Sequence, residues 1–513
     1  MPVATETSII TMPIAIAATA IFIIGAEILL LWPLAVSSRF AMKYSKFNLA
    51  CLIGIQKYSF RRKLTDYTHL LFPTNMSYTS ILTPSKPISS NICLGILLVG
   101  IGLLHSCGPA KRINYAAPKE TMVKSKVKST RFLTGADNVK SYLSLLKGKK
   151  VGVVSNQTGL IAYDSIYPIY DTISQSHLDL IAHKRMHLVD YLATKTHVEL
   201  TRLFAPEHGF RGTADAGETI IDGKDSKTNL PIISLYGDNK KPKSEQLAGL
   251  DVLVFDIQDV GVRFYTYIST LHYVMEACAE NKVTLLVLDR PNPNGTLVDG
   301  PVLEKEYSSF VGMHPIPVLH GMTIGEYALM INGEKWLKDG IQCPLKIVAC
   351  ENYTREMPYS LPAKPSPNLP NDQSIKLYPS LCLFEGTPIS VGRGTNKQFQ
   401  IYGSPQLLAH PFSFTPLPNL GAKDPLYNGK ECCGEDLSFE PAPKQLELKW
   451  LISSYNEWED KSKFFTPFFT KLAGTKQLQQ QIEAGMSEED IRKTWQAGLA
   501  AFKTMRTPYL IYN

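Results

Sequence analysis

The sequence predicts an α/β fold, because apolar, β-branched runs alternate with segments of helical spacing and polar side chains follow each run. Strands that alternate with helices form right-handed crossovers and therefore a parallel sheet. Residues 149–154 are the first predicted strand, and the amide-rich turn 155–159 follows it. Further strands are predicted at 198–204, 251–257 and 283–288, and helices at 187–194 and 265–281.

A second, smaller domain of α+β type is predicted after residue 300, where the sequence becomes rich in proline. This part has helical spacing near 323–337, a strand at 345–348 and loop-like stretches at 366–370 and 384–396. We therefore expect a parallel-sheet domain at 131–300 and a second domain at 301–513. Loops of the second domain are expected to cover the carboxyl edge of the first domain's sheet.

Residues 1–107 differ from the rest and are predicted to be a non-globular signal or membrane segment. The apolar run 9–36 is long enough to span a bilayer, whereas the shorter run 92–104 suits the core of a secretion signal. The second run ends at Leu104-His105-Ser106-Cys107, which resembles a lipoprotein processing box with Cys107 as the lipidated residue.

In this interpretation translation starts at Met76, and the preceding residues are a gene-start artefact. In the alternative, both apolar runs are membrane helices of an anchored protein. Either way the linker 108–130 leads to an exported globular part, in the periplasm or cell envelope.

Composition and motifs argue against several classes of binding partner and cofactor. The net charge of +7 comes from scattered basic residues without a nucleic-acid motif, so no nucleic acid is expected as a partner. The cysteines have no metal-ligand spacing and are predicted to be buried thiols, with one pair involving Cys432-Cys433 as the alternative. No glycine-rich phosphate motif follows a predicted strand, and no cofactor is expected.

Two predicted strands end in polar side chains. Glu207, His208 and Arg211 follow the strand 198–204, and Asp256, Gln258 and Asp259 end the strand 251–257. Functional groups of parallel sheets collect at the carboxyl ends of the strands. One shared cleft is therefore predicted.

Several separated motifs occur in a fixed order, at 155–159, 206–212, 213–218, 256–267, 288–295 and 378–396. Together they resemble the exo-β-N-acetylmuramidase family, also called the NamZ family, over nearly all of 130–513. Residues 161–185 form an insertion relative to the family, either a lid or a frameshifted stretch, and 403–436 is shortened.

The resemblance implies a Rossmann-like domain joined to a smaller C-terminal domain. It also implies hydrolytic release of terminal, non-reducing N-acetylmuramic acid from peptidoglycan fragments, so that the substrate is a peptidoglycan-derived disaccharide or muropeptide. Two alternatives are a muropeptide-binding lipoprotein without turnover and another cell-wall hydrolase, an amidase or esterase. The sequence has no G-x-S-x-G elbow for the latter.

Glycoside cleavage commonly uses one carboxylic acid to protonate the leaving oxygen and a second carboxylate to activate water or attack the anomeric carbon. Glu207 is the candidate acid, since it follows an apolar strand and Pro206, and an apolar setting favours the protonated form of a carboxyl. Its alternative role is structural. Candidates for the second carboxylate are Asp256 and Asp259, followed by Glu218 and Glu385.

His208 is a candidate base or orienting group, or a structural histidine. Its position beside Glu207 also suits a metal ligand. No H-E-x-x-H or other close ligand pair occurs in the sequence, so no metal is predicted.

N-acetylmuramic acid carries a lactyl carboxylate, and arginine pairs bidentately with carboxylates. Arg211, Arg263 and Arg393 are the candidates, each with a structural ion pair as its alternative. Tyr265 and Tyr267 suit either the floor under a sugar ring or the core. Amides suited to sugar hydroxyls, or else to turn capping, are Asn156, Gln258, Asn292, Asn368 and Asn396.

Overall fold

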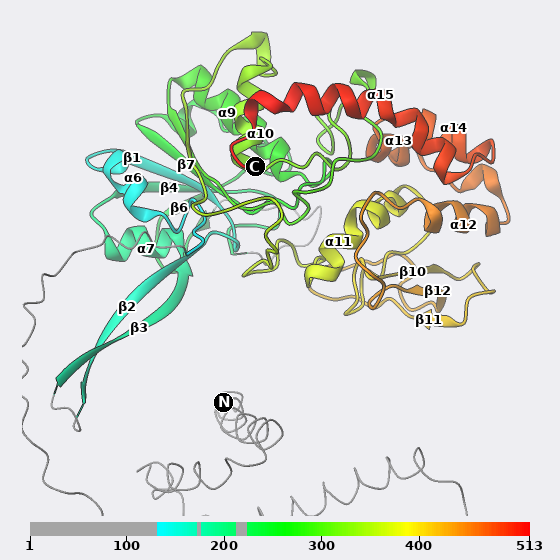
Figure 1. The fold of residues 1–513 in the computed structure, drawn as a ribbon, viewed down its shortest axis with the longest axis horizontal. Coiled ribbons are helices and arrows are strands. Elements are labelled where there is room, and N and C mark those ends of the chain that lie inside the picture. The colour runs from blue at the N-terminus through cyan, green and yellow to red at the C-terminus, as the bar shows by residue number, and fades with distance from the viewer. Residues whose placement is uncertain (1–130, 172–175, 212–222) are drawn as a thin grey trace, which may run out of the picture. The chain divides into compact units, whose positions relative to one another are not determined.

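The computed structural model describes residues 131–171, 176–211 and 223–513. The predicted signal or membrane segment, the linker and Cys107 lie outside these residues, as does Glu218. A seven-stranded sheet with the order β5-β6-β4-β1-β7-β8-β9 forms the centre of the described part (Figure 1). Its strands are β1 (Lys150–Ser155), β4 (Glu199–Ala205), β5 (Gly223–Lys224), β6 (Pro231–Ser234), β7 (Val252–Asp256), β8 (Thr284–Leu288) and β9 (Leu345–Val348).

Neighbouring strands of this sheet are parallel, except that β5 is antiparallel to β6. Numbered along the chain, the parallel strands have the 3-2-1-4-5-6 order of a Rossmann-like, doubly wound sheet. The order reverses between β1 and β7, so the carboxyl ends of these strands and of β4 meet at one edge. The predicted α/β fold with a mainly parallel sheet is confirmed.

The sheet extends further along the chain than the sequence pattern indicates. The predicted strand at 345–348 forms as β9, but it pairs in parallel with β8. The crossover between them contains α10 (Ile324–Gly333). The sheet therefore continues past residue 300, where we expect the second domain to begin, because a strand's local pattern does not reveal its partner.

Helices cover both faces of the sheet. In β7, Leu253 and Phe255 belong to the core that contains α9 (Tyr267–Asn281) and α10. Val252 and Val254 belong to a second core, which contains α6 (Val139–Leu146) and α7 (Leu188–Lys195). Successive side chains of a strand point to opposite faces, so this division produces a three-layer α/β/α arrangement.

The insertion at 161–185 forms a long antiparallel hairpin of β2 (Leu160–Asp171) and β3 (Ser176–His187), which extends away from the sheet (Figure 1). At its base the backbone N–H of Leu188 donates to the carbonyl of Gly159 over 2.7 Å. The chain thus leaves and re-enters the α/β unit at one point, and the register of β1 with its neighbours does not depend on the hairpin.

The C-terminal part contains a three-stranded antiparallel sheet in the order β10-β12-β11 together with several helices, as expected for α+β structure. Its apolar side chains are continuous with the core on the α9 and α10 face of the large sheet. Its elements are α11 (Asp372–Leu381), β10 (Ile401–Ser404), β11 (Phe412–Phe414), β12 (Cys432–Asp436), α12 (Lys449–Glu457), α13 (Pro467–Ala473), α14 (Gln477–Glu483) and α15 (Glu488–Arg506).

The last helix returns the chain to the large sheet (Figure 1). Ile491, Trp495, Leu499 and Phe502 form the buried stripe of α15. Beyond the helix, the Tyr512 hydroxyl donates to the carboxylate of Asp289 over 2.6 Å, at the end of β8. The C-terminus is thereby fixed to the sheet.

The cysteines of the described residues are free thiols, and all but Cys433 are buried. This agrees with the predicted buried thiols. Across the described ranges, no helix is both long and apolar enough to cross a membrane.

A buried ion pair joins the ends of two central strands. Arg290 donates from Nε to Asp256 Oδ1 over 2.7 Å and from Nη2 to Oδ2 over 3.0 Å. Both side chains are at most 1% exposed. Burial disfavours the charged guanidinium, but Asp256 keeps the pKa of Arg290 above its ordinary value. Arg290 Nη2 also donates to the Leu160 carbonyl at the base of the hairpin.

We expect Arg290→Met to lower the free energy of unfolding by about 3–5 kcal/mol, because the change leaves the Asp256 carboxylate buried without its partner. Denaturant titration measures the effect. As the control, Lys149→Met removes the exposed partner of Asp251 and should change stability by less than about 1 kcal/mol. Equal effects of the two substitutions would contradict the assigned role of the buried pair.

Candidate functional site

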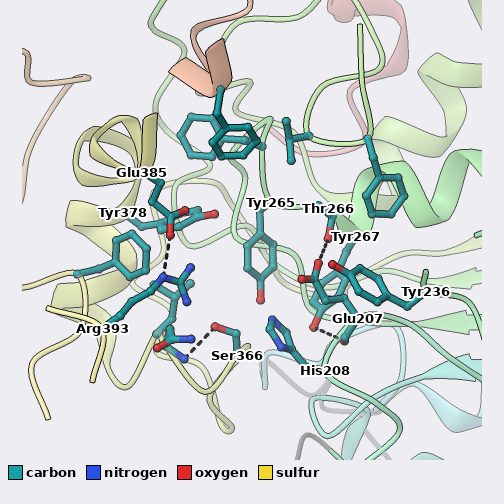
Figure 2. Close-up of a pocket in the computed structure, with 17 residues that line it drawn as sticks. Glu207, His208, Tyr236, Tyr265, Thr266, Tyr267, Ser366, Tyr378, Glu385 and Arg393 are labelled. Carbon is teal, nitrogen blue, oxygen red and sulfur yellow. Dashed lines mark hydrogen bonds and ion pairs between the residues drawn. The ribbon is translucent and has the colours of Figure 1, made fainter. Parts of the chain in front are cut away.

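A cavity of about 390 Å³ lies at the carboxyl edge of the sheet, where loops of the C-terminal part face the turn after β4 (Figure 2). We call it the carboxylate cavity, after Glu207 and Glu385. Of the predicted site residues, the structure brings together Glu207, His208, Tyr265, Tyr267, Asn368, Glu385 and Arg393 in its lining. The cleft predicted between the two polar strand ends does not form, because the Glu207 turn lines this cavity whereas Asp256, Gln258 and Asp259 at the end of β7 do not.

The turn after β4 has an unusual backbone. The N–H of Gly209 donates to the Pro206 carbonyl over 3.1 Å, and His208 and Gly209 have φ angles of 70° and 77°. A positive φ is costly for a residue with a Cβ, and such strain collects at functional sites. The turn places the Glu207 and His208 side chains in the cavity wall.

Contacts from the start of α9 and from the turn after β1 fix the position of Glu207. The Thr266 hydroxyl, at the N-terminus of α9, donates to Glu207 Oε2 over 2.8 Å (Figure 2). The Tyr267 hydroxyl accepts a hydrogen bond from Asn156 Nδ2 over 2.8 Å and lies 3.5 Å from the Glu207 carbonyl. Asn156 therefore acts beneath the cavity, by orienting Tyr267.

The opposite wall carries an ion pair. Arg393 Nε donates to Glu385 Oε1 over 2.7 Å (Figure 2). The Cys382 thiol lies 3.3 Å from the other oxygen of Glu385. Burial disfavours a charged guanidinium, but Glu385 keeps the pKa of Arg393 above its ordinary value. The guanidinium also lies 5.1 Å from the ring centre of Phe399, within cation–π range.

Aromatic rings line the cavity between these two walls. Tyr265 makes edge contacts with Tyr267 and Tyr378, with ring centres 4.9 and 5.9 Å apart. Burial raises the pKa of each of these hydroxyls, so they are neutral near pH 7. The ring of Tyr265 lies between the two walls (Figure 2), and its hydroxyl oxygen is buried. Such a surface suits a sugar ring, which has apolar faces and polar edges.

Asp256 and Asp259 do not line the cavity. The carboxylate of Asp256 is held by Arg290. Asp259 is 4% exposed, accepts a hydrogen bond from the Gly261 N–H over 2.6 Å and lies 3.9 Å from His320 Nε2. Burial raises the pKa of Asp259 to about 7.

Of the three remaining predicted amides outside the cavity, two have structural contacts. Gln258 Nε2 donates to the carbonyls of Asp259 and Pro291, and Asn292 Nδ2 donates to the Met322 carbonyl. Asn396 lines a neighbouring cavity of about 510 Å³, which shares Ser366 with the first.

Two predicted arginines also lie elsewhere. Arg211 pairs with Asp190 and Asp225, at 2.9 and 2.8 Å. Arg263 is fully buried, and its Nη groups donate to four backbone carbonyls. Burial lowers its pKa to about 9. Of the three candidate arginines, the cavity contains Arg393.

Several cavity residues are not predicted from the sequence. Thr266 lies between the candidate residues Tyr265 and Tyr267 at the start of a predicted helix, and this position is the sequence feature that could identify it. Ser366 lies in the stretch 366–370, which the sequence indicates only to be a loop. Tyr236, Phe310 and Phe468 also line the cavity, but they come from separate segments with no local sign of a site.

The described residues contain no group of three or more His, Cys, Asp or Glu side chains that could hold a metal ion. The cavity lining itself offers carboxyl, guanidinium, hydroxyl and imidazole groups.

Comparison with known proteins identifies the family. Residues 151–373 match the family model for the N-terminal domain of the exo-β-N-acetylmuramidase NamZ, and residues 376–512 match that for its C-terminal domain. The chain belongs to the NamZ family. The boundary between the two matched domains lies after β9, consistent with a sheet that extends past residue 300.

Individual NamZ relatives agree with this assignment. The peptidoglycan β-N-acetylmuramidase NamZ of Bacillus subtilis (strain 168) is 37% identical over 442 residues, which cover 82% of this chain and 98% of that protein. A crystal structure of a DUF1343 family protein from Bacteroides fragilis has 42% identity and a TM-score of 0.66, covering 75% of this chain and 99% of the other. A second such B. fragilis structure has 29% identity and a TM-score of 0.60, covering 75% and 100%.

The position of Asp259 predicts a pH dependence of stability. Its pKa in the folded protein, about 7, exceeds the ordinary value of 3.8, so the folded state binds this proton more tightly. The stabilisation is present below about pH 4 and is lost as the pH rises to about 7, by at most about 1.4 kcal/mol per pH unit.

We therefore expect Asp259→Asn to be more stable than the wild type at pH 8 and to lose this advantage at pH 4. Urea titration at both pH values measures the difference. A difference between the two proteins that is the same at both pH values would contradict the assignment.

Proposed function

We propose that this protein is an exo-acting glycoside hydrolase that releases terminal, non-reducing N-acetylmuramic acid from peptidoglycan fragments. The observation that carries the proposal is the carboxylate cavity, in which two carboxyl side chains and one guanidinium surround an aromatic floor. Carboxyl groups supply the acid chemistry of glycoside cleavage, and the guanidinium suits the carboxylate that distinguishes N-acetylmuramic acid from N-acetylglucosamine.

Glu207 is the proposed proton donor to the leaving oxygen. Its carboxyl is oriented by the Thr266 hydroxyl, and its backbone is held by the turn at His208 and Gly209. A proton donor must keep one geometry relative to the glycosidic oxygen, and contacts from two separate elements supply that restraint.

Glu385 is the proposed second carboxylate. The sequence favours Asp256 and Asp259 for this role, but those two lie outside the cavity lining, whereas Glu385 faces Glu207 across the cavity (Figure 2). Its contacts with Arg393 and Cys382 hold it at the opposite wall. From there it is suited to activate water or to stabilise positive charge at the anomeric carbon.

Arg393 is the proposed partner of the lactyl carboxylate. Its Nε is engaged by Glu385, and its terminal nitrogens make no hydrogen bond to any described residue. Those nitrogens can donate to a substrate carboxylate in the fork geometry that arginine favours.

We further propose that the protein is exported and anchored in the cell envelope by lipid on Cys107. The support is the apolar run before the Leu104-His105-Ser106-Cys107 sequence. Radiolabelled palmitate should be incorporated into the wild type and not into Cys107→Ser, with Cys433→Ser as the control. Equal labelling of all three proteins would exclude this anchor.

Glu207→Gln should reduce kcat on a nitrophenyl N-acetylmuramide by at least about a hundredfold, because the amide has no proton to donate, and should leave thermal unfolding unchanged. Glu199→Gln changes an exposed carboxylate of the same strand and serves as the control. Near-normal turnover by Glu207→Gln would remove this residue from the acid role.

Arg393→Ala should raise KM for the muramide about tenfold or more, since a charge-assisted hydrogen bond is lost, while the corresponding glucosaminide stays unreactive. The exposed Arg185→Ala is the matched control. An unchanged KM in Arg393→Ala would show that another group binds the lactyl carboxylate.

A further inference from the structure

The cavity that contains Asn396 has a lining of a different kind, and we call it the amide cavity. It is walled by the side chains of Gln157, Asn396, Gln398 and Asn419, with prolines and Leu420 between them. Lys364 is the charged side chain among its lining residues, and none of them is acidic. Amides and apolar patches without a carboxylate suit a neutral ligand that has hydroxyl and acetamido groups.

The two cavities share walls. Ser366 lines both. In the loop 392–399, Arg393 and Phe399 line the carboxylate cavity, whereas Asn396 and Gln398 line the amide cavity. At Phe399 the backbone has a φ of 53°, in the left-handed region. Around this turn the adjacent side chains of Gln398 and Phe399 line different cavities.

The side chain of Gln398 is the feature of the amide cavity that indicates a ligand. Its residue is only 8% exposed, and its amide makes no hydrogen bond to any described residue. Its amide atoms are not fully enclosed by protein, so they are open to the cavity. A ligand in the amide cavity can therefore hydrogen-bond directly to this otherwise unpaired amide.

The walls of the amide cavity are tied together by hydrogen bonds. Gln157 Nε2 donates to the carbonyls of Lys364 and Pro365, and Asn419 Nδ2 donates to the Thr395 carbonyl. The first two contacts connect the turn after β1 to the loop at 364–365, and the third connects the loop at Asn419 to the loop at Thr395. The side chains of Gln157 and Asn419 are thus held in place before any ligand binds.

We propose that the amide cavity binds the N-acetylated sugar on the leaving-group side of the scissile bond. This inference rests on the proposed function, in which N-acetylmuramic acid occupies the carboxylate cavity. A glycosidic bond joins the two sugars directly, so the second sugar needs a site that adjoins the first, and the shared wall at Ser366 meets that requirement. Gln398 and Asn396 pair with its hydroxyl and acetamido groups, and Leu420, 67% exposed at the edge, covers an apolar face of its ring.

The test compares two substrates that have the same muramic acid and different leaving groups. One is the disaccharide of N-acetylmuramic acid and N-acetylglucosamine, and the other is the nitrophenyl muramide, which has no second sugar. Gln398→Leu and the exposed Asn396→Ala should each lower kcat/KM for the disaccharide about tenfold and for the nitrophenyl muramide less than twofold. Asn428→Ala, an exposed amide outside both linings, is the control and should change neither value.

The outcomes separate this inference from the proposed function. If the wild type cleaves neither substrate, the proposed function fails, and the sugar-site proposal fails with it. If the wild type cleaves both and the variants lose both activities equally, or neither, only the sugar-site proposal is overturned. A loss restricted to disaccharides that carry a stem peptide would assign the cavity to the peptide, which also overturns it. Asn396→Ala keeps the test decisive if Gln398→Leu does not fold.

Discussion

The reversal of strand order between β1 and β7 is the constraint on which the rest of the structure depends. From β1 and from β7 the chain connections run in opposite directions along the sheet. The carboxyl ends of β1, β4 and β7 therefore lie at one edge, and a crevice is left there between the diverging connections. The buried pair of Asp256 and Arg290 holds two of the neighbouring strand ends together. The turn that carries Glu207 follows β4, at the same edge of the sheet as these joined strand ends.

Some carboxylates at this edge have a structural role and others are suited to catalysis, and their surroundings decide which. Asp256 has a bidentate partner and no access to solvent, so its charge stabilises the framework. Asp259 is buried against backbone N–H groups. Glu207 and Glu385 instead line an open volume. A carboxyl can exchange a proton with a substrate only where the substrate can reach it, and this favours the second pair.

The C-terminal part completes the site. The loops 366–369 and 392–399 supply one wall of the carboxylate cavity and part of the lining of the amide cavity. Their positions depend on the continuous core beneath them and on α15, which returns to the large sheet. The site is therefore formed by segments that are far apart in the chain, and neither part of the molecule contains it alone.

The sequence by itself determined the α/β class, most strand and helix positions and the importance of the Glu207 turn, because these depend on local periodicity and local turn chemistry. It also selected Tyr265, Tyr267 and Arg393, which stand beside recognisable motifs. Only the tertiary structure decided which side chains meet. The partner of β9, the pairing of Asp256 with Arg290 and the opposition of Glu207 and Glu385 each join residues distant in sequence, and local patterns carry no information about such contacts.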